Sequence, residues 1–517
     1  MFGLVGILLA LGLIMYLAYR GISVLLLAPV LATLAALFAF DAPLLGLYTQ
    51  VFMSATGGFI ITYFPLFLLG ALFGKLMDDS GAAQAIALGI VKKLGNKHAI
   101  LAIVISCAIL TYGGVSLFVV AFAMYPIAAR LFIQTNIPKR LLPATIALGA
   151  FTFTMTALPG SPAIQNTIPM PTFGTNAFAA PGLGVIAALV MLATGYAWIM
   201  HEAHKARKKG EGYGDPSADK SHQAHGTPRR RAGEAMVPET GHHKQEKQIQ
   251  HRALASDTES APRLHAEDFD PIEIGHHKQG RQTTGRTLVA LIPILVVLVA
   301  NYLFSNHVIP HWNTAYLKLP EFGGIEISSV LGIWATLLAL LSGILTLIVL
   351  ERTRFENLRA TLDGGAHAAA IPIFNTASMV GFGAVIASLP AFIMLRDVVL
   401  GISTDNPLIS LGIAVNVLAG ITGSASGGLS IALHTLGVSY VRLADAAGIS
   451  HELLHRVTTI ATGGLDTLPH NGAVITLLGI SKMTHREAYK DIFFAVVPGP
   501  ILALIVVIGL GMAFGSF

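Results

Sequence analysis

Asp466 and His470 stand four residues apart within an apolar stretch, between Gly463-Gly464 and the dipeptide Leu468-Pro469. An ionisable residue at membrane depth is costly and is by default a candidate for function. Histidine changes charge near neutral pH, and a nearby carboxylate favours its charged form. The pair could therefore carry a coupling proton, with Asp466 stabilising protonated His470, or it could be a structural hydrogen-bonded pair that closes a break in a helix.

The same kind of segment occurs twice. Gly113-Gly114-Val115-Ser116 precedes Leu158-Pro159-Gly160-Ser161, and Gly427-Gly428-Leu429-Ser430 precedes Leu468-Pro469-His470-Asn471. The two spacings are about 45 and 41 residues, which indicates two related halves. Matched segments interrupted by glycine and proline predict a transporter site built from broken helices. Prolines that merely kink packed helices are the plainer alternative.

Broken helices free backbone amides and carbonyls, which must face protein, water or ligand because lipid offers them no partner. The N-terminal amides of such half-helices attract a carboxylate without needing a buried lysine. Hydroxyl and amide side chains crowd both breaks and could replace water around an organic acid. Our candidate contacts for a bound substrate are Thr154, Ser161, Asn166, Ser426, His470 and Asn471, and our candidates for coupling are Asp466 and His470. His434 is a weaker proton candidate.

The elements that would position these residues are membrane helices. Of 517 residues 54% are hydrophobic and 12% charged, and the mean hydropathy is +0.67. Apolar stretches near the roughly 20 residues needed to span a bilayer predict ten to twelve transmembrane helices. The clear stretches are 3–18, 24–40, 59–73, 100–120, 183–200, 288–304, 327–350, 368–395 and 493–513, and the broken ones are 142–171, 408–433 and 453–480.

A polar insert divides the apolar sequence. Residues 201–286 hold 28 of the 61 Lys, Arg, Asp and Glu residues and 10 of the 19 histidines. The predicted organisation is a first membrane repeat at 1–200, a disordered cytoplasmic linker at 201–286 and a second membrane repeat at 287–517. The sequence GHHKQ occurs twice in the linker, and a metal-sensing role for its paired histidines is the alternative to a solvated tether; these are His242, His243, His276 and His277.

Other classes of function fit poorly. The single cysteine, Cys107, can form neither a disulfide framework nor a thiolate metal site, and we interpret it as a helix-packing residue. We expect no cofactor, no bound metal and no nucleic-acid partner, since the basic residues gather in the linker. A membrane-embedded enzyme is the rival class, but the chain contains neither His-Glu-x-x-His nor Gly-x-Ser-x-Gly. The N-terminal apolar stretch lacks a basic start and a cleavage site, which favours a retained first span.

Four strings resemble the gluconate:proton symporter (GntP) family of the ion transporter superfamily, and within it the D-β-hydroxybutyrate permeases. They are TYGGVSLFVVAFAMYPIA, TALPGSPAIQNTIPMPTFGT, GSASGGLSIAL and GGLDTLPHNGAVITLLGI. Gluconate carriers differ from this chain at residues 466–472 and lack the His-rich insert, which favours a shorter hydroxy acid over a sugar acid.

That resemblance implies a homodimeric, proton-coupled symporter for a hydroxylated monocarboxylate in a bacterial inner (plasma) membrane. It also implies re-entrant hairpins and an elevator-like movement. The expected fold class is thus an all-α polytopic membrane protein with two inverted repeats. A sodium-coupled carboxylate transporter, using hydroxyls and carbonyls of the breaks, is the alternative within the same class.

Overall fold

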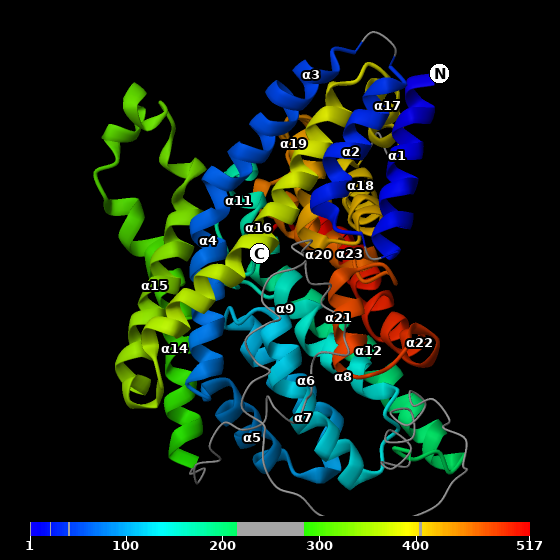
Figure 1. The fold of residues 1–517 in the computed structure, drawn as a ribbon. Coiled ribbons are helices and arrows are strands. Elements are labelled where there is room, and N and C mark those ends of the chain that lie inside the picture. Colours follow the sequence, from blue (N-terminus) through cyan, green and yellow to red (C-terminus); the bar gives the residue numbers. More distant parts are fainter. Residues whose placement is uncertain (1, 21, 40–41, 215–283, 403–405) are drawn as a thin grey trace, which may run out of the picture. The chain divides into compact units, whose positions relative to one another are not determined.

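The computed structural model describes residues 2–20, 22–39, 42–214, 284–402 and 406–517. Every regular element in these residues is a helix (Figure 1). The first half contains α1 (Phe2–Tyr19), α2 (Val24–Leu37), α3 (Leu44–Gly46), the π-helix η1 (Leu47–Phe52), α4 (Met53–Asp79), α5 (Ala82–Leu94), η2 (Asn96–His98), α6 (Ala99–Tyr112), α7 (Leu117–Thr135), α8 (Leu141–Ala150), α9 (Phe153–Thr156), α10 (Ile164–Thr167), α11 (Pro169–Phe173) and α12 (Pro181–Lys208).

The second half begins with α14 (Thr284–Leu303) and ends with α23 (Pro498–Phe514). Between them lie η5 (Phe304–Val308), η6 (Ile309–His311), η7 (Ala315–Lys318), η8 (Pro320–Phe322), η9 (Ile327–Ser329), α15 (Leu331–Glu351), η10 (Arg352–Arg354), α16 (Leu358–Ser388), α17 (Ala391–Leu400), α18 (Pro407–Thr422), α19 (Ala425–Ala447), α20 (His451–Leu465), α21 (Gly472–Ile480) and α22 (His485–Val496).

Seven of the described helical segments are long and apolar enough to cross a membrane, and an eighth arises if α5 and α6, bent by 109°, form one span. Four shorter apolar helices accompany them. An α-helix satisfies its own backbone hydrogen bonds, which is why helices suit apolar sequences in lipid. The predicted all-α polytopic membrane fold is confirmed.

Each of the three segments that the sequence marked as broken is interrupted in the structure. Residues 142–171 contain α8, α9 and α10, whereas 408–433 and 453–480 each contain two helices. Gly114 and Gly423 have φ values of +96° and +59°, a backbone conformation that glycine adopts without strain. Ser424 then caps α19 by accepting a hydrogen bond from the Gly427 amide at 3.1 Å.

Helices of the two halves follow the same order at a nearly constant offset. Adding 310 to the bounds of α6 gives 409–422, which nearly reproduces α18 (Pro407–Thr422), and the first residue of α8 maps onto that of α20. Corresponding helices of the two halves also make corresponding contacts. Helix α4 packs along its counterpart α16. Helix α7 contacts α21 of the second half, and its counterpart α19 contacts α11 of the first half. In Figure 1, α5 to α9 lie in the lower part of the view and α17 to α19 in the upper part, whereas α16 runs from the lower part to the upper part.

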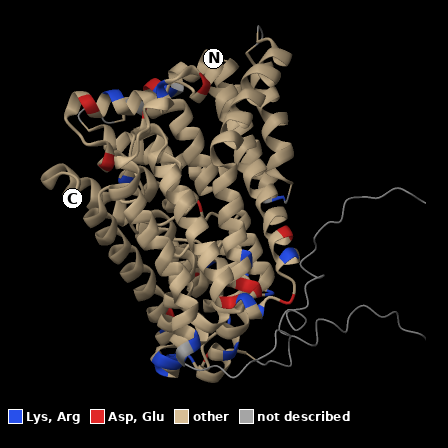
Figure 2. Ribbon diagram, turned by 90° about the vertical axis from the view of Figure 1, so that its left-hand side faces the viewer, with Lys and Arg blue, Asp and Glu red and all other residues tan. Residues whose placement is uncertain are grey.

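The first residues of the predicted linker at 201–286 continue a helix that begins before it. Helix α12 continues through Lys208, so the first residues of the 201–286 segment are helical. Residues 215–283, including the four histidines of the GHHKQ repeats, lie outside the described part of the chain. In Figure 2, Lys and Arg gather at the lower end of the helices. The N-terminus lies at the opposite, upper end.

Candidate functional site

The break between α20 and α21 is organised by Asn471. Its side-chain oxygen accepts hydrogen bonds from the amides of Ala473 and Val474 at 2.6 and 3.0 Å, which caps α21. Its Nδ2 donates to the carbonyls of Asp466 at 2.6 Å and Gly423 at 2.9 Å. All four hydrogen-bonding positions of this amide are therefore occupied. Asn471 therefore joins the break between α20 and α21, called the second break below, to the α18–α19 break. Its side chain has no hydrogen-bonding position left for a ligand in this conformation.

Other polar groups at the second break are unsatisfied. Asp466 Oδ1, Thr467 Oγ1 and His470 Nε2 are buried and make no hydrogen bond. His470 lies against Gly423, since a Cβ on that glycine would be 2.5 Å from His470 Cδ2. No ion pair links Asp466 with His470 among the residues that the structure describes, so each has an atom available to another group. Buried polar atoms without partners mark places where a proton, ion, water or ligand is expected.

The first break, between α9 and α10, has no side-chain cap, and its polar side chains are used within the break itself. Ser161, which is 310 residues before Asn471, accepts a hydrogen bond from the Ala163 amide at 3.3 Å. Asn166 donates to the carbonyls of Ser161 at 2.9 Å and Ala177 at 3.0 Å. Thr154 is fully buried and donates to the Gly149 carbonyl of its own segment at 3.1 Å. The side chains of these three candidates are therefore engaged in hydrogen bonds that hold the break together.

Helix α20 of the second half reaches the first break through two buried side chains. His455 Nε2 is 3.2 Å from Asn166 Oδ1, and His455 Nδ1 is 2.6 Å from Thr175 Oγ1. Arg456 donates to the carbonyls of Ala157 and Ala179. The guanidinium is completely buried, so the interior of the helical bundle contains a cation beside the first break. A His-Arg pair inside an apolar helix is the signal that sequence reasoning missed.

Ser426 is the second residue of α19, directly after the α18–α19 break. Its hydroxyl is half-buried and approaches Thr376 Oγ1 at 3.4 Å and Ser424 Oγ at 3.5 Å, so α16 and α19 meet through hydroxyl groups. Asn416, on α18, has a buried Oδ1 that makes no hydrogen bond. It lies beside α20, since a Cβ on Gly464 would come within 2.6 Å of that oxygen.

The two breaks meet where α9 contacts α20. A Cβ on Gly463 would lie 3.3 Å from Thr156 Oγ1. Gly463 is three residues before Asp466, and Thr156 is the last residue of α9. The structure therefore brings the first break beside the helix that leads into the second break, although the two are about 300 residues apart in sequence. Backbone groups and neutral polar side chains dominate this region, a donor set that suits a carboxylate, hydroxyl or small hard ion.

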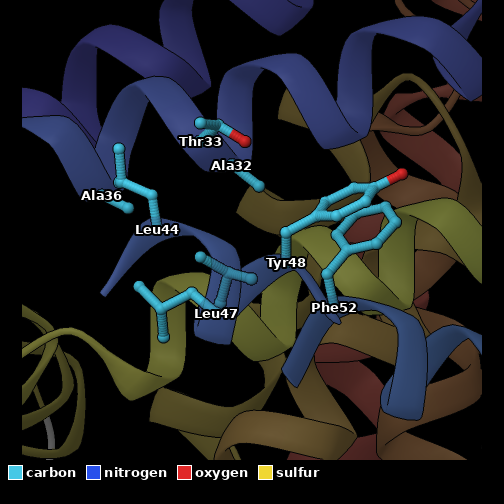
Figure 3. A pocket seen from close by; sticks show the side chains of 8 residues that line it. Ala32, Thr33, Ala36, Leu44, Leu47, Tyr48 and Phe52 are labelled. Atoms are coloured by element: carbon cyan, nitrogen blue, oxygen red, sulfur yellow. The ribbon is translucent and has the colours of Figure 1, made fainter. Parts of the chain in front are cut away.

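A small cavity lies elsewhere, between α2, η1 and α16 (Figure 3). Ala32, Ala36, Leu44 and Phe52 are among its mostly apolar lining residues, and Thr33 and Tyr48 supply its hydroxyls. It contains none of the candidate residues. In the described ranges no group of three or more His, Cys, Asp and Glu side chains could hold a metal ion. Cys107 is buried in α6 against Gly149 of α8, where it packs the two helices together.

Comparison with known proteins identifies the family to which this chain belongs. Residues 14–423 match the family model described as citrate transporter (CitMHS), and the chain belongs to this family of membrane transporters. It is 42% identical over 496 residues, covering 95% of each chain, to the uncharacterized transporter YxjC of Bacillus subtilis (strain 168).

The assignment to the gluconate:proton symporter family is therefore wrong. Glycine pairs and Leu-Pro steps reflect the physical demands of broken membrane helices, so short strings of this kind can recur in different transporter families. The structure also shows that the counterpart of Gly113-Gly114 in the second half lies four residues earlier than the sequence comparison predicted. Gly427-Gly428 lies inside α19, and the break that corresponds to Gly113-Gly114 is at Gly423-Ser424.

Proposed function

We propose that this transporter is a secondary carrier that moves a small hydroxylated carboxylate anion together with protons. The observation that supports it best is the contrast at the second break. Asn471 is saturated with hydrogen bonds, whereas its neighbours Asp466, Thr467 and His470 keep buried atoms without partners. A fixed frame around unsatisfied groups is what a site that binds and releases its cargo requires.

Proton coupling rests on Asp466 and His470. Both can change protonation, and neither is committed to another side chain among the described residues. A sodium gradient is the alternative driving force. It is favoured by the unpartnered oxygens of Asp466, Thr467 and Asn416, since carboxylate, hydroxyl and amide oxygens are typical ligands of hard cations.

Membership of a citrate transporter family makes citrate, a hydroxylated tricarboxylate, the first substrate to test. The shorter hydroxy acid 3-hydroxybutyrate and the sugar acid gluconate are the other candidates. The substrate would contact Ser426 and His470 directly. Ser161, Asn166 and Asn471 would present backbone amides and carbonyls of the two breaks, because their side chains are engaged in holding those breaks.

The membrane arrangement we propose is two inverted repeats, residues 1–200 and 287–517, with an elevator-like movement of the breaks. The common helix order at an offset of 310 residues supports it. Lys and Arg at one end of the helices would mark the cytoplasmic side of the plasma membrane, and the N-terminus would then lie on the outside. A homodimer is part of this proposal, and chemical cross-linking in native membranes would test it.

The decisive experiment is uptake of radiolabelled citrate, 3-hydroxybutyrate and gluconate into proteoliposomes under a pH gradient and, separately, under a sodium gradient. We expect accumulation driven by protons in the wild type. Asp466→Asn and His470→Ala should abolish accumulation while leaving the protein folded and inserted in the membrane.

His434→Ala is the matched control for these variants, because His434 is exposed on α19. Accumulation driven by sodium alone would replace the proton mechanism. Normal proton-driven accumulation in both site variants would remove Asp466 and His470 from the coupling site.

A further inference from the structure

Arg456 is the largest side chain that is completely buried in the described part of the chain. It lies on α20, ten residues before Asp466. Arginine keeps its proton in proteins, so this position contributes a permanent positive charge inside the helical bundle. Such charges within membrane segments are rare and are commonly associated with substrate or ion pathways.

The guanidinium holds two segments that flank the first break. Its Nε and Nη2 donate to the carbonyl of Ala179 at 3.0 and 2.6 Å, and its Nη1 donates to the carbonyl of Ala157 at 3.0 Å. Ala157 is the C-cap residue that follows α9, where carbonyl groups point outward and favour a cation. Gly184 of α12 makes room for this arrangement, since a Cβ there would be 2.5 Å from the Ala157 oxygen.

No carboxylate neutralises this charge in the ranges that the structure describes, where Arg456 donates its hydrogen bonds to carbonyl oxygens. Glu452, one turn earlier on the same helix, is exposed and accepts a hydrogen bond from Ser516. Asp466 is about 15 Å further along the helix by the rise of 1.5 Å per residue. Tyr112 is the neighbouring titratable group, and it donates its hydroxyl hydrogen to the Pro159 carbonyl at 2.6 Å.

The adjacent histidine is satisfied without carrying a charge. Asn166 uses both hydrogens of its amide on backbone carbonyls, so its oxygen accepts a hydrogen from His455 Nε2. His455 Nδ1 lies 2.6 Å from the Thr175 hydroxyl, which donates to it in the neutral form of the ring. Among the described residues that hydrogen-bond across the first break, Arg456 is the one whose positive charge is permanent.

We propose that Arg456 is a positioning residue whose unneutralised charge makes the carrier select multiply charged carboxylates over monocarboxylates. This inference rests on the proposed function, because it assumes that the anion binds between the breaks. Arg456 does not touch the substrate, since its donors face Ala157 and Ala179. Its field nevertheless acts on a substrate near Ser161, four residues after Ala157. At about 10 Å and an effective dielectric constant of about 20, the attraction corresponds to roughly tenfold in affinity for each substrate charge.

Three variants separate the charge from the hydrogen bonds. Arg456→Gln removes the charge, Arg456→Lys keeps the charge but loses the fork of donors, and Gly184→Ala displaces the fork without changing any charge. Dissociation constants are measured by calorimetry for 3-hydroxybutyrate, malate and citrate, which carry one, two and three carboxylates. The uptake rate of each anion is measured in proteoliposomes.

We expect wild-type affinity to rise from 3-hydroxybutyrate to malate to citrate. The ratio of citrate to 3-hydroxybutyrate affinity should fall roughly 100-fold in Arg456→Gln, since the two anions differ by two charges. In Arg456→Lys and Gly184→Ala this affinity ratio should stay within about threefold of the wild-type ratio, although both variants should take up each anion more slowly.

An unchanged ratio in Arg456→Gln would overturn the charge role while leaving the proposed function intact. If that variant fails to fold, the wild-type series decides, because an affinity that does not rise with substrate charge refutes the inference by itself. A wild type that neither binds nor transports any of the three would instead refute the proposed function, and the role of Arg456 with it.

Discussion

Replacing Asn471 with alanine tests whether the second break is held by this side chain. The variant loses two hydrogen bonds that cap α21 and two that reach the Gly423 and Asp466 carbonyls. A buried hydrogen bond contributes about 1 kcal/mol, and carbonyls left without a partner add to the cost. We therefore expect the free energy of unfolding to fall by about 3–5 kcal/mol.

Asn406 provides the matched control because it also caps a helix with its side-chain oxygen, by accepting one hydrogen bond from the Leu408 amide at 3.0 Å. Asn406→Ala should cost about 1 kcal/mol, the usual value for one cap. Asn471→Ser should recover part of the loss in Asn471→Ala, since serine also caps helices well but cannot reach the two carbonyls.

The assay is reversible unfolding in mixed micelles by titration with sodium dodecyl sulfate, followed by helical circular dichroism, with uptake measured in parallel. In Asn471→Ala uptake and stability should fall together. If Asn471→Ala lost uptake at unchanged stability, the side chain would be a direct substrate ligand and the structural interpretation would be refuted. If Asn471→Ala lowered the free energy of unfolding no more than Asn406→Ala does, the argument from four hydrogen bonds would be refuted.

Two other changes test the geometry. Gly423→Ala places a Cβ in a left-handed backbone conformation and 2.5 Å from the His470 ring, so it should cost about 2–4 kcal/mol and slow uptake. Gly448→Ala has the same backbone strain, at φ +67°, with open space around it and should cost only about 1 kcal/mol; equal losses in thermal scans would show that the ring yields freely. Glu211 and two buried carboxylates hold Arg140 by hydrogen bonds, which raise the pKa of its guanidinium. Arg140→Gln should therefore cost about 2–4 kcal/mol at pH 8 and less at pH 5, where protonation removes the unpaired negative charges, whereas Gln at the more exposed Arg396 should cost under about 1 kcal/mol at both; a deficit that does not change with pH would contradict the charge argument.

The class of fold could be predicted from the sequence because it follows from composition and from local backbone chemistry. A mean hydropathy of +0.67 with long apolar stretches leaves only helices or closed barrels in a bilayer, and the stretches have the length of helices. Glycine and proline act through their own backbone, so the breaks near Pro159 and Pro469 were also visible. The position of the α18–α19 break, four residues before Gly427-Gly428, could not be predicted, because a glycine pair fits equally well inside a helix that packs closely on another.

The roles of the polar side chains were decided by tertiary structure. A sequence shows that Asn471 and His470 are adjacent, but it cannot show that the first is saturated by carbonyls 48 and 5 residues away while the second keeps a nitrogen without a partner. Family membership likewise depended on similarity along hundreds of residues rather than on four short strings.

What the sequence by itself determined is therefore everything that depends on near neighbours in the chain: membrane helices, their interruptions, and the polar residues beside them. What only the tertiary structure decided is which atoms meet across the bundle, such as Arg456 with Ala157 and Asn416 with Gly464. The physical reason is that hydropathy and backbone conformation are local properties, whereas hydrogen-bond saturation and burial of charge depend on partners that folding brings together from distant parts of the chain.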